Sequence, residues 1–329
     1  MKIYQFLFTS TLAAQILEAE LNQTSPVVIS TWVPNGFADA ARHAWAELQR
    51  GGSALDAVES GCNWCEELQP FSNYTCGCDG SVGLGGSPDQ NGETTLDAMI
   101  MDGNTMDVGA VGALRRIQHA ISVARKVMEH TYHTLLVGDQ ATDFALSFGF
   151  KDMSLSTERS AQIWADWFKH GQKPDYRKDS TMLANTKHER WGHDTIGMVV
   201  LDKDGSIACG TTTNGASLKI PGRVGDSPIM GAGAYCETGV GGATQTGDGD
   251  QMMRFLPSFA AVNFMRAGDS PTVACEKAVA PIRKWYPSAE GALICMNAKG
   301  EFGGAKLNYA SFSFSARTAD MKDVEAITI

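Results

Sequence analysis

The order of the expected elements constrains the fold of this chain more than any single motif does. Residues 195–201 and 206–213 predict two strands joined by a turn at 202–205, and residues 291–297 and 301–306 predict a second hairpin. Helices are expected in consecutive pairs, over residues 38–49 and 53–67 and again over residues 251–266 and 270–286. Strands in antiparallel pairs and helices in consecutive pairs predict an α+β fold, with two stacked sheets between two helical layers.

Shorter elements are expected elsewhere in the chain. Ile117, Ile121, Ala124 and Met128 share one face of an expected long helix, and a further helix is expected over residues 141–148. The remaining expected strands cover residues 27–32, 81–84, 94–101, 106–111 and 311–316.

The dipeptide Asp194-Thr195 separates two stretches of opposite character. In residues 151–190, 14 of the 40 residues are charged, and we expect one short helix around Trp164, Trp167 and Phe168 in an otherwise exposed, mobile segment. Such a segment can be cut without dismantling a core. Thr195 opens an apolar run and is most simply a strand residue. If the bond before it breaks, however, its new α-amine can activate its own hydroxyl as a nucleophile.

Composition and the amino terminus limit the function classes. A net charge of −10 and the lack of a basic stripe argue against nucleic-acid binding. Lys2 and the uncharged, mostly apolar residues 3–17 predict a signal peptide over residues 1–19, with a frayed amphipathic helix as the alternative. This stretch is shorter than the roughly 20 residues that span a bilayer, so we expect no membrane anchor.

Cysteines and sequons favour the secretory pathway. Asn22 and Asn73 each lie in a glycosylation sequon, and eight cysteines suit an oxidising compartment. The cluster Cys62, Cys65, Cys76 and Cys78 allows a zinc site or disulfides, and the one-residue spacing at its end favours disulfides. Cys275 and Cys295 fall on different expected elements, which a disulfide between them could join.

Several familiar chemistries have no motif in this chain. There is no Gly-x-Ser-x-Gly and no metal-binding histidine spacing, so we expect no metal and no cofactor. The glycine-rich residues 239–247 lack a P-loop ending. Arg223 and Asp226, three residues apart in a turn, offer a cation and an anion for a free amino acid, with a surface ion pair as the alternative.

Five runs together resemble the glycosylasparaginases, a family of N-terminal nucleophile hydrolases. They are Trp191-Gly-His-Asp-Thr-Ile-Gly-Met-Val-Val200, Gly222-Arg-Val-Gly-Asp-Ser-Pro-Ile229, Gly51-Gly-Ser-Ala-Leu-Asp-Ala-Val-Glu-Ser-Gly-Cys62, Asp79-Gly-Ser-Val-Gly-Leu-Gly-Gly-Ser-Pro88 and Glu93-Thr-Thr-Leu-Asp-Ala-Met-Ile-Met-Asp-Gly103. The resemblance implies a four-layer αββα sandwich and self-cleavage. It also implies hydrolysis of the link between asparagine and sugar in degraded glycoproteins in lysosomes, or after secretion.

The same resemblance implies roles for individual residues. Cleavage between Asp194 and Thr195 divides one composite domain into chains of residues 20–194 and 195–329, and two such units form a dimer. Thr195 is the nucleophile and base, with Thr213 supporting its hydroxyl, and Thr246 and Gly247 form the oxyanion hole. Arg223 binds the substrate carboxylate, Asp226 binds its amine, and Trp32 lines the site. The implied substrate-binding set also includes Val224, Gly225, Asp248 and Gly249.

The resemblance also implies two disulfides, Cys65–Cys78 and Cys275–Cys295. The chain departs from the family at Glu290, where an aromatic residue is expected, and at Met230, where proline is expected. Two alternatives remain: an asparaginase or isoaspartyl peptidase of the same superfamily, and a secreted binding protein that stays uncleaved.

Overall fold

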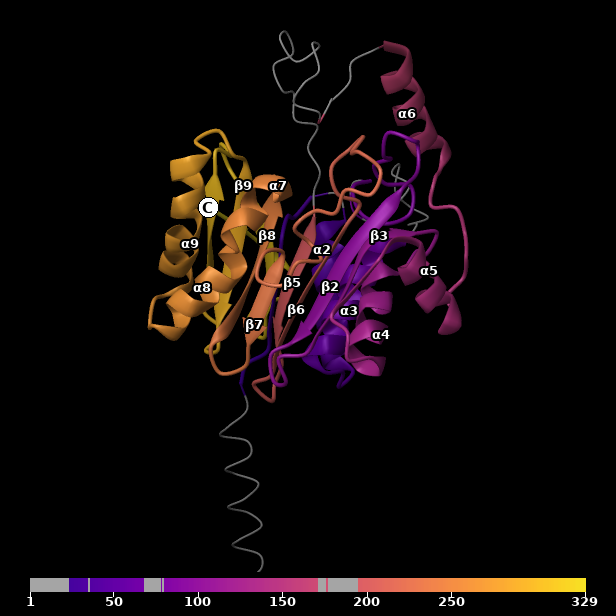
Figure 1. The fold of residues 1–329 in the computed structure, drawn as a ribbon. Coiled ribbons are helices and arrows are strands. Elements are labelled where there is room, and N and C mark those ends of the chain that lie inside the picture. Colours follow the sequence, from indigo (N-terminus) through magenta and orange to yellow (C-terminus); the bar gives the residue numbers. More distant parts are fainter. Residues whose placement is uncertain (1–23, 35, 68–77, 79, 171–175, 177–194) are drawn as a thin grey trace, which may run out of the picture.

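A computed structural model describes residues 24–329, apart from residues 35, 68–77, 79, 171–175 and 177–194 (Figure 1). The predicted signal peptide, both sequon asparagines Asn22 and Asn73, Cys76 and the cleavage residue Asp194 lie outside the described residues.

The described strands form two sheets, so the fold is α+β. The larger sheet has the order β12-β11-β1-β5-β6-β2-β3-β4, and every neighbouring pair is antiparallel except β3 and β4. The smaller sheet has the antiparallel order β10-β9-β8-β7. The strands of the larger sheet are β1 (Val27–Ser30), β2 (Thr95–Asp102), β3 (Val108–Arg115), β4 (Leu135–Val137), β5 (Ile196–Leu201), β6 (Ile207–Thr213), β11 (Ser313–Thr318) and β12 (Glu325–Thr328). Those of the smaller sheet are β7 (Ala234–Glu237), β8 (Gly241–Gly247), β9 (Gly291–Asn297) and β10 (Phe302–Leu307).

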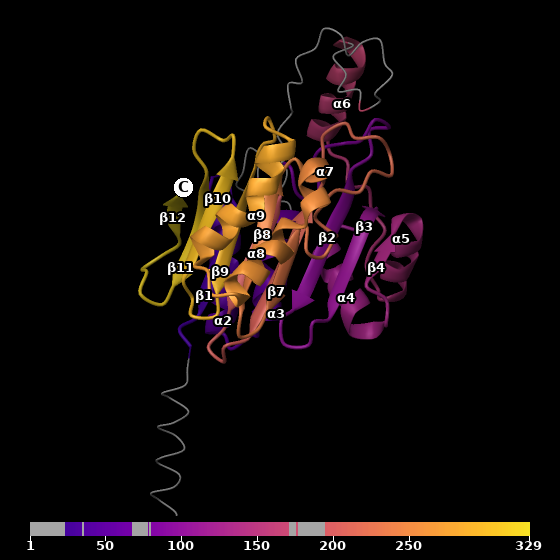
Figure 2. The same ribbon diagram turned by 60° about the vertical axis from the view of Figure 1, so that its left-hand side comes forward.

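Two groups of helices cover the outer faces of the sheets, the first group (α2 to α5) on the larger sheet and the second (α8 and α9) on the smaller sheet, while α6 extends beyond the end of the sheets (Figures 1 and 2). One apolar cluster joins the first group of helices to the larger sheet, and another joins α8 and α9 to the smaller sheet. A third cluster contains residues of both sheets, including Val199 of β5 and Ile294 of β9. The helices of the first group are α2 (Phe37–Gln49), α3 (Ala54–Glu66), α4 (Ala120–His130) and α5 (Gly138–Ser147). The others are α6 (Glu158–His170), α7 (Gly249–Met252), the 3-10 turn η2 (Met253–Phe255), α8 (Pro257–Arg266) and α9 (Pro271–Trp285).

Local sequence signals explain where several helices begin. The Ser53 side chain accepts from the Asp56 amide, and Asp56 accepts from the Ser53 amide, which confirms the predicted capping box of α3. Pro271 opens α9 at its first turn, as predicted. Helix α6 carries the three aromatic residues that predicted it, and Trp164 Nε1 donates to the Gln90 carbonyl oxygen across 3.1 Å, so this helix contacts the loop that precedes β2.

The predicted helix over residues 251–266 is wrong in one respect. It is divided into α7, η2 and α8, because Leu256 adopts a left-handed conformation with φ of 49° immediately before Pro257. A proline cannot continue the hydrogen bonding of a preceding turn, but it suits the first position of a new helix.

The predicted strand over residues 81–84 is also wrong, because this stretch forms turns. Gly83 has φ of 77°, and a Cβ there would lie 2.3 Å from the Glu66 Cα atom, so the segment is a close-fitting loop against the end of α3. Ile117 is buried but precedes α4. Strands β4, β7, β8 and β12 were not predicted from the sequence.

Candidate active site

Thr195 lies directly before β5 and is 2% exposed. Because Ile196 pairs with Thr212 in the adjacent strand β6, Thr195 comes to lie beside Thr213. The Thr195 hydroxyl donates to the Thr213 hydroxyl oxygen across 3.2 Å, and that oxygen also accepts from the Gly215 amide at 3.0 Å. The residue predicted as nucleophile therefore has its predicted hydroxyl partner in hydrogen-bonding contact.

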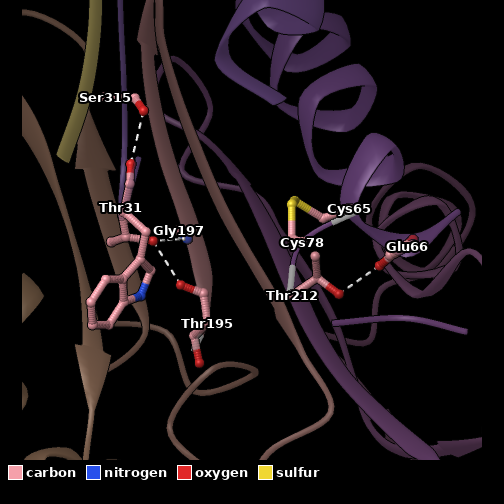
Figure 3. The surroundings of a disulfide bond; sticks show 9 residues. Thr31, Cys65, Glu66, Cys78, Thr195, Gly197, Thr212 and Ser315 are labelled. Carbon is pink, nitrogen blue, oxygen red and sulfur yellow. Dashed lines mark hydrogen bonds between the residues drawn. A yellow bond between two sulfur atoms is a disulfide. The ribbon is translucent and has the colours of Figure 1, made fainter. Parts of the chain in front are cut away.

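Thr31, which follows β1, holds the other side of Thr195. Its hydroxyl donates to the Thr195 carbonyl oxygen across 2.6 Å and accepts from the Gly197 amide at 2.9 Å (Figure 3). The sequence analysis missed Thr31. Its place immediately before Trp32, at the end of a buried strand, is the signal that could have indicated it.

Thr246 of β8 contacts two other predicted site residues. Its hydroxyl oxygen accepts from the Thr195 backbone nitrogen at 3.2 Å and from Trp32 Nε1 at 3.1 Å. Trp32 has φ of 65°, which is unusual for a residue with a side chain, and its ring makes edge contacts with Phe312 and Tyr309. The aromatic contacts and the hydrogen bond fix a strained residue beside Thr195, as is common at functional sites.

Gly247 follows Thr246 at the end of β8. Its φ is 129°, and a Cβ there would lie 2.3 Å from the Cα atom of Gly291, so only glycine suits this position. Asp248 accepts from the Gln251 amide and so caps α7. At Gly249 a Cβ would lie 2.1 Å from an Asp226 carboxylate oxygen. Gly247 and Gly249 therefore allow the backbone to approach Gly291 and Asp226 closely.

Arg223 is largely buried in the turn before β7. Its Nη2 and Nε atoms donate to the same Asp250 oxygen at 2.8 and 3.2 Å. The partner of Arg223 in the structure is thus Asp250, and not Asp226. The Asp250 side chain is half exposed, so this ion pair extends from the buried guanidinium to the surface.

The neighbours of Arg223 are anchored to strands of the larger sheet. The Gly225 amide donates to Asp97 of β2 across 2.9 Å, and the other Asp97 oxygen accepts from Ala113 at 2.7 Å. Val224 packs against Gly112, where a Cβ would lie 3.1 Å from its methyl groups. Asp97 was not predicted from the sequence, because it lies on β2 and fixes the turn around Arg223 only through the Gly225 amide.

Asp226 is buried beside this turn. Gln245 of β8 donates to one of its carboxylate oxygens across 2.8 Å. Burial raises the pKa of Asp226 to about 6, against the opposing effects of Arg223 and the Gln245 hydrogen bond. Gln245 was also missed, although a lone amide among small residues in Gly241–Gly247 could have indicated it.

Lys219 is a further buried cation near these residues. Its Nζ atom donates to the Asn214 carbonyl oxygen at 2.6 Å and to the Thr95 carbonyl oxygen at 3.4 Å. Burial lowers the pKa of Lys219, while the nearby Asp97 raises it. Lys219 thus holds the loop that follows Thr213 against β2.

Cysteine positions agree with the disulfide predictions. The structure has both predicted bonds, Cys65–Cys78 and Cys275–Cys295. Cys62, Cys209 and Cys236 are buried free thiols.

Among the described residues, no group of three or more His, Cys, Asp and Glu side chains is placed to hold a metal ion. In that same part of the chain, no helix has the length and apolar character needed to cross a bilayer.

Comparisons with known proteins agree with this geometry. A family model described as asparaginase matches residues 9–326. The chain is 51% identical over 312 residues to N(4)-(beta-N-acetylglucosaminyl)-L-asparaginase of Mus musculus, covering 88% of this chain and 87% of the mouse protein. The Rattus norvegicus protein of the same name is 52% identical over 299 residues, covering 85% and 84%. A probable isoaspartyl peptidase/L-asparaginase 3 of Arabidopsis thaliana is 41% identical over 355 residues, covering 98% and 96%. The chain therefore belongs to the asparaginase family.

Proposed function

We propose that this protein is a self-cleaving amidohydrolase that splits N(4)-(beta-N-acetylglucosaminyl)-L-asparagine into aspartate and a glycosylamine. The observation that carries the proposal is the environment of Thr195, whose hydroxyl contacts Thr213 while its backbone nitrogen contacts Thr246. The names of the mouse and rat relatives support the choice of substrate.

Self-cleavage is the first step of the proposed mechanism. In the intact chain the Thr195 nitrogen is an amide and cannot act as a base. The Thr195 hydroxyl attacks the carbonyl carbon of Asp194, and the acyl group moves from nitrogen to oxygen, which gives an ester and a free α-amine. Water then hydrolyses the ester, which frees the Asp194 α-carboxylate and the Thr195 hydroxyl. The reference pKa of such an amine, about 7.7–8.0, leaves a usable neutral fraction near neutral pH.

Substrate hydrolysis follows on the mature enzyme. The α-amine takes the hydroxyl proton as Thr195 attacks the side-chain amide of the glycosylated asparagine. A β-aspartyl ester forms, the glycosylamine leaves with a proton, and water releases aspartate. The Thr246 hydroxyl and the Gly247 amide hold the developing oxyanion, and each such donor contributes about 10²–10³ in rate.

Recognition of the aspartyl part uses two buried charges. Arg223 binds the α-carboxylate in place of Asp250, since a guanidinium suits a planar carboxylate. Asp226 binds the α-amine when its carboxyl is ionised. The neighbouring Val224, Gly225, Asp248 and Gly249 shape this subsite. Trp32 lines it, and Glu290, whose carbonyl oxygen accepts from the Asp248 amide, lies at its edge.

The wider organisation is also part of the proposal. We infer that the contacts of the two sheets and two helical groups form a four-layer αββα sandwich. Residues 1–19 are a signal peptide, and residues 20–194 and 195–329 become two chains of one composite domain. Two such units pair as a dimer in the lysosome, with glycans on Asn22 and Asn73.

An isoaspartyl peptidase activity is the second candidate, favoured by the Arabidopsis relative. It would use the same Thr195, Arg223 and Asp226. Comparing kcat/KM for glycosylasparagine and for a β-aspartyl dipeptide separates the two activities, and a higher value for the dipeptide would overturn the proposed substrate.

The decisive experiment is intact mass and amino-terminal sequencing of the purified protein. We expect two chains, the smaller beginning at Thr195, and a single uncleaved chain for Thr195→Ala. A folded wild-type protein that remains one chain would contradict the proposal and would favour the binding-protein alternative.

A further inference from the structure

Glu66 is a buried acid at the end of α3, outside the set of proposed catalytic residues. Its side chain is fully buried. One oxygen, Oε1, accepts from the Thr212 hydroxyl at 2.5 Å and from the Ile121 amide at 3.0 Å. The other oxygen, Oε2, has no hydrogen-bond partner among the described residues. A buried oxygen without a partner is costly for a carboxylate, but less so for the hydroxyl of a neutral acid.

The contact with Ile121 supplies a hydrogen-bond acceptor to the first turn of another helix, α4. Helix α4 begins after His119, whose side chain makes no capping hydrogen bond. The first amides of a helix have no partner within it, so they need an acceptor from elsewhere. Glu66 supplies that acceptor from α3 and thereby links α3 to α4.

The charges around Glu66 favour its neutral form. Burial is the main cause that raises its pKa to about 8, against the two hydrogen bonds that it accepts, and Glu59 of α3 and Glu67, the residue after that helix, raise it further. From α4, Arg125 pairs with Glu59 at 2.7 Å, and His119, just before α4, lies 3.7 Å from Glu67. Both side chains face the neighbouring carboxylates, and strand β6 offers Glu66 only the Thr212 hydroxyl.

The contact with Thr212 connects Glu66 to the candidate active site. Successive side chains of a strand point to opposite faces, so Thr212 faces α3 while Thr213 faces Thr195. Figure 3 shows Glu66 and Thr212 joined in this way, beside the Cys65–Cys78 disulfide. The Glu66 carbonyl oxygen also accepts from the Leu84 amide at 3.2 Å, so both its backbone and its side chain are held.

We propose that Glu66 is a positioning residue, whose neutral carboxyl holds Thr212 and so keeps Thr213 in contact with the Thr195 hydroxyl. The inference rests on the proposed role of Thr195. It assigns to Glu66 no contact with substrate or with the reacting atoms.

Three variants test this role through two reactions, self-cleavage and substrate hydrolysis. Glu66→Gln keeps an acceptor oxygen for Thr212 and Ile121, so we expect its cleavage rate and kcat to stay within about threefold of wild type. Glu66→Leu and Thr212→Val each remove the contact, so we expect both rates to fall about tenfold or more with little change in KM.

Val58→Ala is the matched control for general destabilisation. Val58 lies on the same helix and packs on β6, where a Cβ at Gly210 would lie 2.7 Å from its methyl group. This variant should lower Tm while leaving kcat close to wild type. The proposal is overturned if Glu66→Leu keeps wild-type rates, or if Glu66→Gln is as impaired as Glu66→Leu.

The pH dependence of stability tests the neutral, buried state of the Glu66 carboxyl. Between its ordinary pKa of about 4.5 and its raised pKa of about 8, Glu66 binds more protons in the folded state than in the unfolded state. Stability therefore falls as pH rises through this window. Relative to Glu66→Gln, wild type should lose Tm at the alkaline end, and parallel Tm profiles would overturn the neutral carboxyl of the proposal.

The two readouts keep the two proposals apart. If wild type cuts itself but hydrolyses no glycosylasparagine, the proposed substrate is wrong and Glu66 is judged by the cleavage rates. If wild type is active and the Glu66 variants match it, only the inference about Glu66 is wrong.

Discussion

The Asp226 carboxyl has an energetic conflict with its surroundings. It is buried, and its pKa lies near 6 instead of 3.8. Between these two values the folded protein binds more protons than the unfolded chain, so this group makes the protein less stable as pH rises through the window. A substrate ammonium beside the carboxylate would remove that conflict, which is a physical reason for the site to bind an amine.

Asp226→Asn should therefore stabilise the free protein while impairing its proposed activity. Asn can still accept from Gln245, and loss of the buried charge should add up to about 3 kcal/mol of stability at pH 7. At pH 3, where Asp226 is neutral in both states, wild type and variant should melt together. Thermal melts at both pH values check this, and a lower Tm for the variant at pH 7 would contradict it.

The same titration sets an expectation for substrate binding. Below pH 6 a growing fraction of Asp226 is neutral and cannot pair with an ammonium group, so KM should rise as pH falls through 6. Measuring KM from pH 4.5 to 7.5 tests this. A KM that is flat over the range would show that Asp226 does not bind the amine.

Thr213→Val tests the contact to the nucleophile itself. The variant removes the hydroxyl that accepts from Thr195, and loss of such a contact should lower kcat about tenfold to a hundredfold. Thr213→Ser keeps the hydroxyl and should retain most of the activity. Equal kcat for the two variants would argue that the hydroxyl has no role.

At the scale of elements, the disulfide Cys275–Cys295 joins the outer helix α9 to β9. The closed loop spans 20 residues, and replacing both cysteines by alanine should cost about 3 kcal/mol of unfolding free energy. Because the bond lies away from Thr195, kcat at 25 °C should change little. Denaturant unfolding with parallel kinetics checks both parts, and a large loss of kcat with an unchanged unfolding midpoint would contradict them.

Element type was predictable where hydrophobic periodicity and caps agree, as in α3 and the hairpin of β5 and β6. It was not predictable for β8, because Gly241–Gly247 has few of the residues typical of strands. Its small residues are needed by the tertiary structure, since a Cβ at Gly242 would lie 2.5 Å from a Val199 methyl group of the other sheet. Likewise, the hydrophobic pattern of residues 251–266 is helical throughout, so it does not indicate that the helix is interrupted at Leu256.

Site prediction from sequence had a similar limit. Thr195, Arg223 and Asp226 lie in runs that resemble a family, so they could be named. Thr31, Asp97 and Gln245 act by holding these residues or their neighbours, and they reach the site from the end of β1, from β2 and from β8. Only the fold brings such partners together.

At the scale of the whole molecule, strands from before Thr195 and strands from after it are intermixed in the larger sheet. Strands β5 and β6 lie between β1 and β2, so strands from after Thr195 are enclosed on both sides by strands from before it. Neither part contains a contiguous half of this sheet. Cleavage before Thr195, as proposed, would therefore leave the two parts joined by complete strand ladders.

We expect the cleaved chains to stay together until the whole domain unfolds. They should elute together on dilution and melt in one cooperative transition, with a Tm that rises with protein concentration because unfolding also separates the chains. Calorimetry and size-exclusion chromatography of the cleaved protein test this. Separate transitions for the two chains would contradict it.

The hydrogen bonds that the Thr246 hydroxyl oxygen accepts fix the orientation of its own O–H bond. Its oxygen accepts hydrogen bonds from both the Thr195 nitrogen and Trp32 Nε1. A hydroxyl oxygen has two lone pairs, so both are already occupied and its own hydrogen must point away from these two neighbours. Any carbonyl oxygen that enters beside Thr195 therefore meets a hydroxyl oriented as a donor in advance, with no need to turn it.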